Sequence, residues 1–78
     1  YYVAGSKVPG VFNLGGDLAL FQMLIRARDR EALLEDGKRC IDCIYPRIRH
    51  YGSTTLTTIS LVQGDALGGG FETALSSD

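Results

Sequence analysis

The chain has 78 residues, of which 45% are hydrophobic and 22% are charged, and its formal net charge is −1. A charge so close to neutral gives no electrostatic reason to expect a nucleic acid or an anionic membrane as partner. No apolar run approaches the ~18 residues of a membrane span, and nothing in the sequence has the pattern of a secretory leader. We therefore expect a cytoplasmic protein.

Both ends of the chain suggest a piece of a longer polypeptide. The chain begins in the strand-like run Tyr1–Ala4 without an initiator Met, and it stops directly after an apolar segment without a helix-stop signal. A domain of this size buries only about 60% of the surface that its unfolded chain exposes, so its margin of stability is small. We interpret residues 1–78 as a fragment of a single domain.

The first part of the chain predicts two short strands followed by a helix. Tyr1–Ala4 and Val8–Phe12 favour extended structure, and the Pro-Gly pair inside the second run indicates an irregular or edge strand. After the flexible loop 13–16, Asp17 is a suitable N-cap for a short helix. The apolar residues of this helix recur at helical spacing: Leu18, Leu20, Phe21, Leu24 and Ile25.

A long helix is predicted from Asp29, which can cap it, to about Tyr51. Pro46 should kink this helix or end it near Tyr45, because proline lacks an N–H and clashes with the carbonyl group four residues earlier. 

The last third of the chain predicts one strand and one helix. Thr54–Gln63 is rich in β-branched residues and reads as a strand whose Ile59–Val62 end is buried. Phe71–Ser76 reads as the first turns of a helix. The predicted order is therefore strand, strand, helix, helix, strand, helix.

A glycine-rich turn joins the last predicted strand to the last predicted helix: Gly64-Asp65-Ala66-Leu67-Gly68-Gly69-Gly70-Phe71-Glu72. Backbone N–H groups at the start of a helix are unpaired, and glycine lets a ligand approach them closely. Such turns often cradle phosphate, but a P-loop requires Lys-Ser/Thr where Phe71-Glu72 stand, and a dinucleotide fingerprint requires spaced glycines. Glu72 can serve as an acid/base beside such donors, although a first-turn glutamate ordinarily only complements the helix dipole.

The segment Phe12-Asn13-Leu14-Gly15-Gly16-Asp17-Leu18 repeats the arrangement of strand, glycine turn and helix start. Two such turns could direct two backbone N–H donors at one carbonyl oxygen. Donors held in this way stabilise an oxyanion or enolate by several kcal/mol.

Together the two segments resemble the signatures of the crotonase (enoyl-CoA hydratase/isomerase) family. The first signature is an aromatic residue, a short loop, Gly-x-Asp and a hydrophobic residue; the second is Gly-x-Ala-x-Gly-Gly-Gly-x-Glu, which residues 64–72 match at every fixed position. The resemblance implies an α/β crotonase-like ββα spiral, of which residues 1–78 would be the N-terminal half of one catalytic domain. It also implies that the N–H groups of Gly16 and Gly69 form an oxyanion hole and that Glu72 is a catalytic carboxylate. We expect further substrate contacts from Phe12, Leu14, Gly15, Gly68 and Gly70, although Phe12 and Leu14 could equally belong to the core.

Within that family, the chain looks most like the diffusible-signal-factor synthases. The similar residues are Phe12 to Phe21, Leu24-Ile25-Arg26, Asp29-Arg30 and Cys40. This resemblance implies a dehydratase that converts a 3-hydroxyacyl group on acyl carrier protein (ACP) to a cis-2-unsaturated fatty acid and releases it as a thioesterase. No cofactor is implied beyond the CoA or ACP phosphopantetheine that carries the substrate.

The same resemblance implies a homotrimer or larger assembly for the full-length protein and a second catalytic glutamate after Asp78. The alternatives are a general enoyl-CoA hydratase/isomerase of fatty acid metabolism and a non-catalytic crotonase-like scaffold.

The remaining candidate residues have simpler interpretations. Cys40 and Cys43 lack a second Cys/His pair, so we expect reduced, partly buried cysteines and no metal site. His50 has no evident partner, and with Arg47 and Arg49 it predicts a solvated basic face; docking of a phosphopantetheine carrier or an acidic carrier protein is the alternative. Asp17 is interpreted as a structural helix cap.

Overall fold

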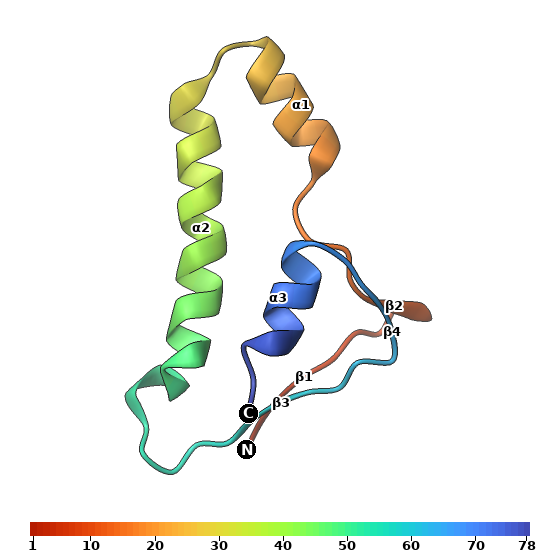
Figure 1. Cartoon of the computed structure of the whole chain (residues 1–78), viewed down its shortest axis with the longest axis vertical. Coiled ribbons are helices and arrows are strands. Elements are labelled where there is room, and N and C mark those ends of the chain that lie inside the picture. Colours follow the sequence, from red (N-terminus) through yellow and green to blue (C-terminus); the bar gives the residue numbers. More distant parts are fainter.

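Figure 1 shows the computed structural model, which describes the whole chain, residues 1–78. The molecule is flat and extended, with principal dimensions of 44 × 31 × 16 Å and a radius of gyration of 14.3 Å. A compact domain of the same length would have a radius of gyration of about 11.5 Å. The elements in chain order are β1 Tyr2–Ala4, β2 Gly10–Asn13, α1 Leu18–Arg26, α2 Arg30–Ile48, a 3-10 turn at His50–Gly52, β3 Thr58–Ser60, β4 Gly64–Ala66 and α3 Gly69–Leu75.

The strands form two short parallel pairs. β1 pairs with β3, and β2 pairs with β4 in a register that sets Gly10 opposite Gly64 and Asn13 opposite Ala66, with an irregularity in between. Parallel strands need a long crossover connection, and the helical hairpin of α1 and α2 supplies it here. Because the paired β2 and β4 end side by side, the two glycine turns that follow them also lie side by side.

The predicted starts of α1 and α2 are confirmed. Asp17 accepts a hydrogen bond from Leu20 N at 3.1 Å, and Asp29 accepts one from Ala32 N, also at 3.1 Å. In both cases the carboxylate satisfies an N–H group that has no partner within the helix.

The sequence predicted that Pro46 would either kink the long helix or end it near Tyr45. The helix does not end there, because α2 continues through Pro46 to Ile48. Proline removes a single N–H donor, and it stands only two residues before the helix terminus. The next turn closes normally, since Arg49 N donates to Tyr45 O at 3.1 Å. A proline in the last turn therefore costs less than one in the middle of a helix.

The single strand predicted over Thr54–Gln63 is also wrong. The segment before β3 is a turn, in which Ser53 Oγ accepts hydrogen bonds from the N–H groups of Thr55 and Leu56, both at 3.2 Å. A serine hydroxyl that binds nearby backbone in this way competes with strand pairing. β1 offers a partner to only three residues, so β3 is confined to Thr58–Ser60 and a separate strand, β4, follows.

Few side chains are buried in this flat arrangement. Five of the 78 residues are buried, and Phe12 is the one hydrophobic residue among them. The predicted burial of Ile59–Val62 is wrong, since Ile59 is 39% exposed and Val62 is 49% exposed. A two-stranded pair has too little area to cover both faces. The structure is a small α/β arrangement, and its assignment to the crotonase spiral stays a prediction.

One glycine in α3 is required by the packing against β2. Gly70 is buried, and a Cβ atom added to it would overlap the carbonyl group of Asn13. We expect Gly70→Ala to lower the free energy of unfolding by about 1–3 kcal/mol, because the backbones must separate to make room. Urea unfolding followed by circular dichroism measures this.

The matched control for that substitution is Gly37→Ala in the middle of α2. A Cβ atom there has no neighbour within 4 Å, so alanine should stabilise the helix by about 0.5–1 kcal/mol. Equal stability of the two variants would contradict the close approach of α3 to β2.

Candidate functional site

The two glycine turns predicted to act together are in contact. Leu67 N donates to Asn13 O at 3.0 Å, which extends the pairing of β2 and β4 beyond the strands. A Cβ atom added to Gly15 would lie 2.8 Å from Leu67 O and 2.9 Å from Gly69 N. Only a residue without a side chain allows the backbones to approach this closely.

The predicted oxyanion-hole residues and the predicted carboxylate meet at Gly69. A Cβ atom placed on Gly69 would lie 4.0 Å from the Gly16 nitrogen and 4.0 Å from Glu72 Oε2. Residues that are more than fifty positions apart in the sequence therefore surround one small volume. The Glu72 side chain is exposed and accessible from solvent.

Two backbone N–H groups of the glycine turns, those of Gly16 and Gly69, have no backbone acceptor, whereas the nitrogens of the three residues after Gly69 are hydrogen-bonded. Gly70 N donates to Leu67 O at 2.8 Å, and the nitrogens of Phe71 and Glu72 donate to Gly68 O at 3.0 and 3.2 Å. Gly16 N and Gly69 N are not among the donors outside the regular helices and strands. Gly69 is also the first residue of α3, where an N–H group has no partner within the helix. Neither nitrogen therefore has a backbone acceptor.

Asn13 is a positioning residue that the sequence analysis did not identify. Its Oδ1 accepts a hydrogen bond from Gly15 N at 2.8 Å, and this bond holds the first glycine turn. Gly15 has φ of +79° and Gly68 has φ of +53°, values that favour glycine. An asparagine two residues before a glycine is a recognisable signal of this kind of turn.

The other residues predicted to contact substrate lie in different surroundings. Phe12 is buried at 9% exposure, within β2, whereas Leu14 is 56% exposed. Phe21 of α1 approaches Gly16, since a Cβ atom on Gly16 would lie 2.5 Å from the end of its ring. An open, mostly apolar hollow runs along α1 from this point and is lined by Leu18, Ala19, Phe21, Gln22, Ile25 and Arg26.

No cluster of three or more His, Cys, Asp or Glu side chains could hold a metal ion.

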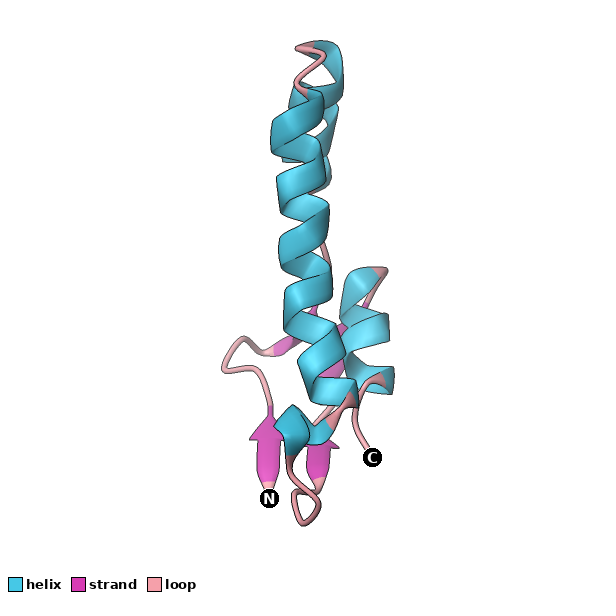
Figure 2. Cartoon of the chain, turned by 90° about the vertical axis from the view of Figure 1, so that its left-hand side faces the viewer, coloured by secondary structure: helices cyan, strands magenta, loops and turns pink.

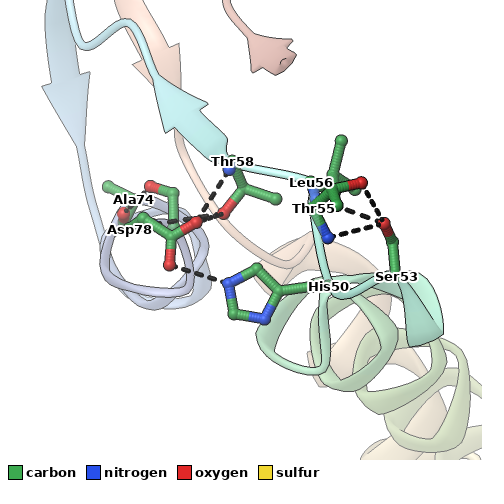
Figure 3. A network of polar contacts seen from close by, with 8 residues as sticks. His50, Ser53, Thr55, Leu56, Thr58, Ala74 and Asp78 are labelled. Carbon is green, nitrogen blue, oxygen red and sulfur yellow. Dashed lines mark hydrogen bonds and ion pairs between the residues drawn. The ribbon is translucent and has the colours of Figure 1, made fainter.

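A separate polar network joins the 3-10 turn after α2 to β3 and the last residue (Figure 3). His50 Nε2 lies 2.7 Å from Asp78 Oδ1, so the expectation that His50 has no partner is wrong. Asp78 Oδ2 accepts a hydrogen bond from Thr58 N at 2.8 Å.

His50 and Tyr51 both have positive φ, near +50°, a conformation that non-glycine residues seldom adopt. Loss of solvent around the Tyr51 hydroxyl raises its pKa, and the neighbouring Tyr2 raises it further.

The predicted solvated basic face is also wrong for Arg47. Its side chain is 4% exposed, and its Nη2 donates to Ile59 O at 3.2 Å and to Ser60 Oγ at 3.1 Å. The guanidinium carbon lies 5.2 Å from the centre of the Tyr2 ring, which is a cation–π distance. Arg47 therefore holds α2 against the β1–β3 pair, while Arg49 remains exposed.

The two cysteines are free, as expected, but both are exposed rather than partly buried. They lie on α2, where the flat molecule leaves them uncovered.

Acid should release Asp78 from this network. The hydrogen bond from Thr58 N, and after it the one from His50, hold the pKa of the Asp78 carboxyl below its ordinary value of 3.8. A lowered pKa means that the contact stabilises the fold above pH 3.8 and is lost as the pH falls through the lowered value. We expect the Thr58 amide resonance to titrate with a midpoint below 3.8. The Asp78→Asn variant should show no such titration; a midpoint above 3.8 in the parent chain would contradict the assignment.

The comparisons with known proteins do not assign the chain to a family. No protein-family model, curated protein or solved structure matches it. None of the helices combines the length and the apolar character needed to cross a bilayer. The crotonase resemblance therefore remains a prediction that rests on the two glycine segments.

Proposed function

We propose that this chain carries the carbonyl-binding half of an acyl-thioester dehydratase/hydratase of the crotonase type. The observation that supports the proposal is the convergence of Gly16, Gly69 and Glu72: a Cβ atom on Gly69 would stand 4.0 Å from both the Gly16 nitrogen and Glu72 Oε2. Two backbone donors and one carboxylate around a shared volume are the groups that enolate chemistry next to a thioester requires.

In the proposed reaction, the thioester carbonyl oxygen accepts hydrogen bonds from the N–H groups of Gly16 and Gly69. These bonds strengthen as negative charge develops on that oxygen, so they lower the barrier to removal of the proton at C2. Backbone donors held by neighbouring turns need no reorganisation during the reaction.

Glu72 exchanges a proton with the substrate beside this oxyanion hole. Dehydration removes the C2 proton and the C3 hydroxyl group, which leaves as water after it accepts a proton. The family resemblance assigns the partner role to a second carboxylate located after Asp78 in the sequence. Hydration of an enoyl thioester follows the same path in reverse.

The most specific form of the proposal concerns the substrate. The similarity to diffusible-signal-factor synthases supports dehydration of a 3-hydroxyacyl-ACP to a cis-2-unsaturated acyl-ACP, followed by hydrolysis of its thioester, which releases the free fatty acid. Residues 1–78 would then be part of a cytoplasmic catalytic domain that works as a trimer or larger assembly, with no cofactor besides the phosphopantetheine carrier.

Product analysis of the intact polypeptide tests this proposal. It is incubated in parallel with 3-hydroxyacyl-ACP and with trans-2-enoyl-CoA, and the products are identified by mass spectrometry. A free cis-2-enoic acid from the first substrate is the expected result. If the only reaction observed is formation of 3-hydroxyacyl-CoA from trans-2-enoyl-CoA, the result would favour a general enoyl-CoA hydratase instead. If neither thioester is consumed, both proposals fail and the scaffold alternative gains support.

A further inference from the structure

The outer face of α2 carries an unpartnered apolar stripe. Leu34, Ile41, Tyr45 and Ile48 are 60%, 65%, 59% and 51% exposed. They follow one another at intervals of seven, four and three residues, which places them on one side of a helix. In Figure 2, α2 runs along the front of the molecule with no other element drawn over it. Water therefore contacts apolar side chains along most of α2.

A row of charged side chains lies along one flank of this stripe. Glu31, Lys38, Asp42 and Arg49 follow one another at intervals of seven, four and seven residues and are all exposed. The two ion pairs within the chain are made by other residues. The four charges therefore alternate in sign along the flank and have no ionic partner within the chain.

We propose that α2 packs antiparallel against α2 of a second copy of this chain, around a two-fold axis close to residue 40. Glu31 and Arg49 lie nine residues before and after that position, and Lys38 and Asp42 lie two residues before and after it. The two-fold axis consequently brings each acidic side chain opposite a basic one of the other copy. Each of these pairs forms twice, because the interface is self-complementary.

The apolar stripe fits the same arrangement. Leu34 of one copy comes opposite Tyr45 and Ile48 of the other, and Ile41 comes opposite its own counterpart close to the axis. Burial of these side chains removes apolar surface from water, which favours association. A parallel pair in register would instead place the two charged rows on opposite sides of the interface, where they cannot pair with each other, so the pattern favours the antiparallel orientation.

Charge reversal distinguishes this interface from other modes of association. The dissociation constant of the chain is measured by sedimentation across a series of concentrations. We expect Lys38→Glu to weaken the dimer on the order of tenfold or more, because the new glutamate faces Asp42 of the other copy. Asp42→Lys should weaken it for the same reason. The double variant Lys38→Glu/Asp42→Lys should restore dimerisation, since both pairs are re-formed with opposite polarity.

Two further variants complete the test. Ile41→Asp places two carboxylates beside the axis and should abolish this two-fold dimer. Lys7→Glu makes the same charge change at an exposed site outside α2 and should leave the dimer unchanged. Circular dichroism confirms that each variant retains its helices. A wild-type chain that is monomeric at every concentration, a dimer that survives Ile41→Asp, or a double variant weaker than the single ones would overturn the proposal.

Discussion

Replacement of Glu72 by Gln is expected to lower the rate of thioester dehydration by about 100- to 10,000-fold, the usual contribution of one general acid or base. Glutamine keeps the size of the side chain but cannot exchange the proton. The fold should not change, because Glu72 is exposed and forms no ion pair within the chain. Turnover of 3-hydroxyacyl-ACP by the intact polypeptide is the measurement.

Asp65 supplies a matched control for Glu72. It is an exposed carboxylate on β4, just before the same glycine turn. Asp65→Asn removes the same charge from the neighbourhood and should leave turnover close to that of the parent. An unchanged product yield from the Glu72→Gln variant would remove the proposed acid/base role and favour the scaffold alternative.

The second large effect is expected at Gly69. The chain has room for a methyl group at this position, but that methyl group would occupy the space that the substrate carbonyl needs. A Cβ atom on Gly69 would lie 3.7 Å from Gly15 Cα and 4.0 Å from Gly16 N, which are ordinary contact distances. Gly69→Ala should therefore fold with nearly unchanged stability. The methyl group would occupy the volume between the two proposed donors and Glu72, so turnover should fall by about 100- to 1,000-fold, as when one oxyanion donor is lost.

Gly15→Ala separates a blocked site from a distorted one. Its Cβ atom would lie 2.8 Å from Leu67 O, and Gly15 has positive φ, so this variant should lose both stability and turnover. Gly69→Ala should lose turnover alone. Full turnover by a well-folded Gly69→Ala variant would show that no substrate carbonyl approaches this part of the backbone.

Local features of the fold could be predicted because they depend on neighbouring residues. Asp17 and Asp29 cap the helices that follow them, since a capping carboxylate binds N–H groups three residues away. The end of α2 and the break between β3 and β4 could not be predicted in the same way. Both depend on competition between local preference and available partners, such as the short β1 strand opposite Thr58–Ser60.

Contacts between distant residues were also beyond sequence reasoning. The hydrogen bond between His50 and Asp78 joins residues 28 positions apart. Arg47 is buried because Tyr2 of β1 and Ser60 of β3, which are far apart in the sequence, both contact its side chain. Neither side chain has a distinctive pattern around it in the sequence. A basic residue at the end of a helix is ordinarily solvated, and only the packing of α2 on the β1–β3 pair changes that.

The candidate site divides along the same line. Residue type and spacing alone identified the two glycine turns and the carboxylate of Glu72 as elements of possible oxyanion chemistry. Whether the turns meet was decided by the parallel pairing of β2 with β4, which brings the Gly15 and Gly69 backbones into contact. The spacing of residues along the chain indicates which N–H groups each turn can offer. The register of the strands determines whether the N–H groups of the two turns lie close together.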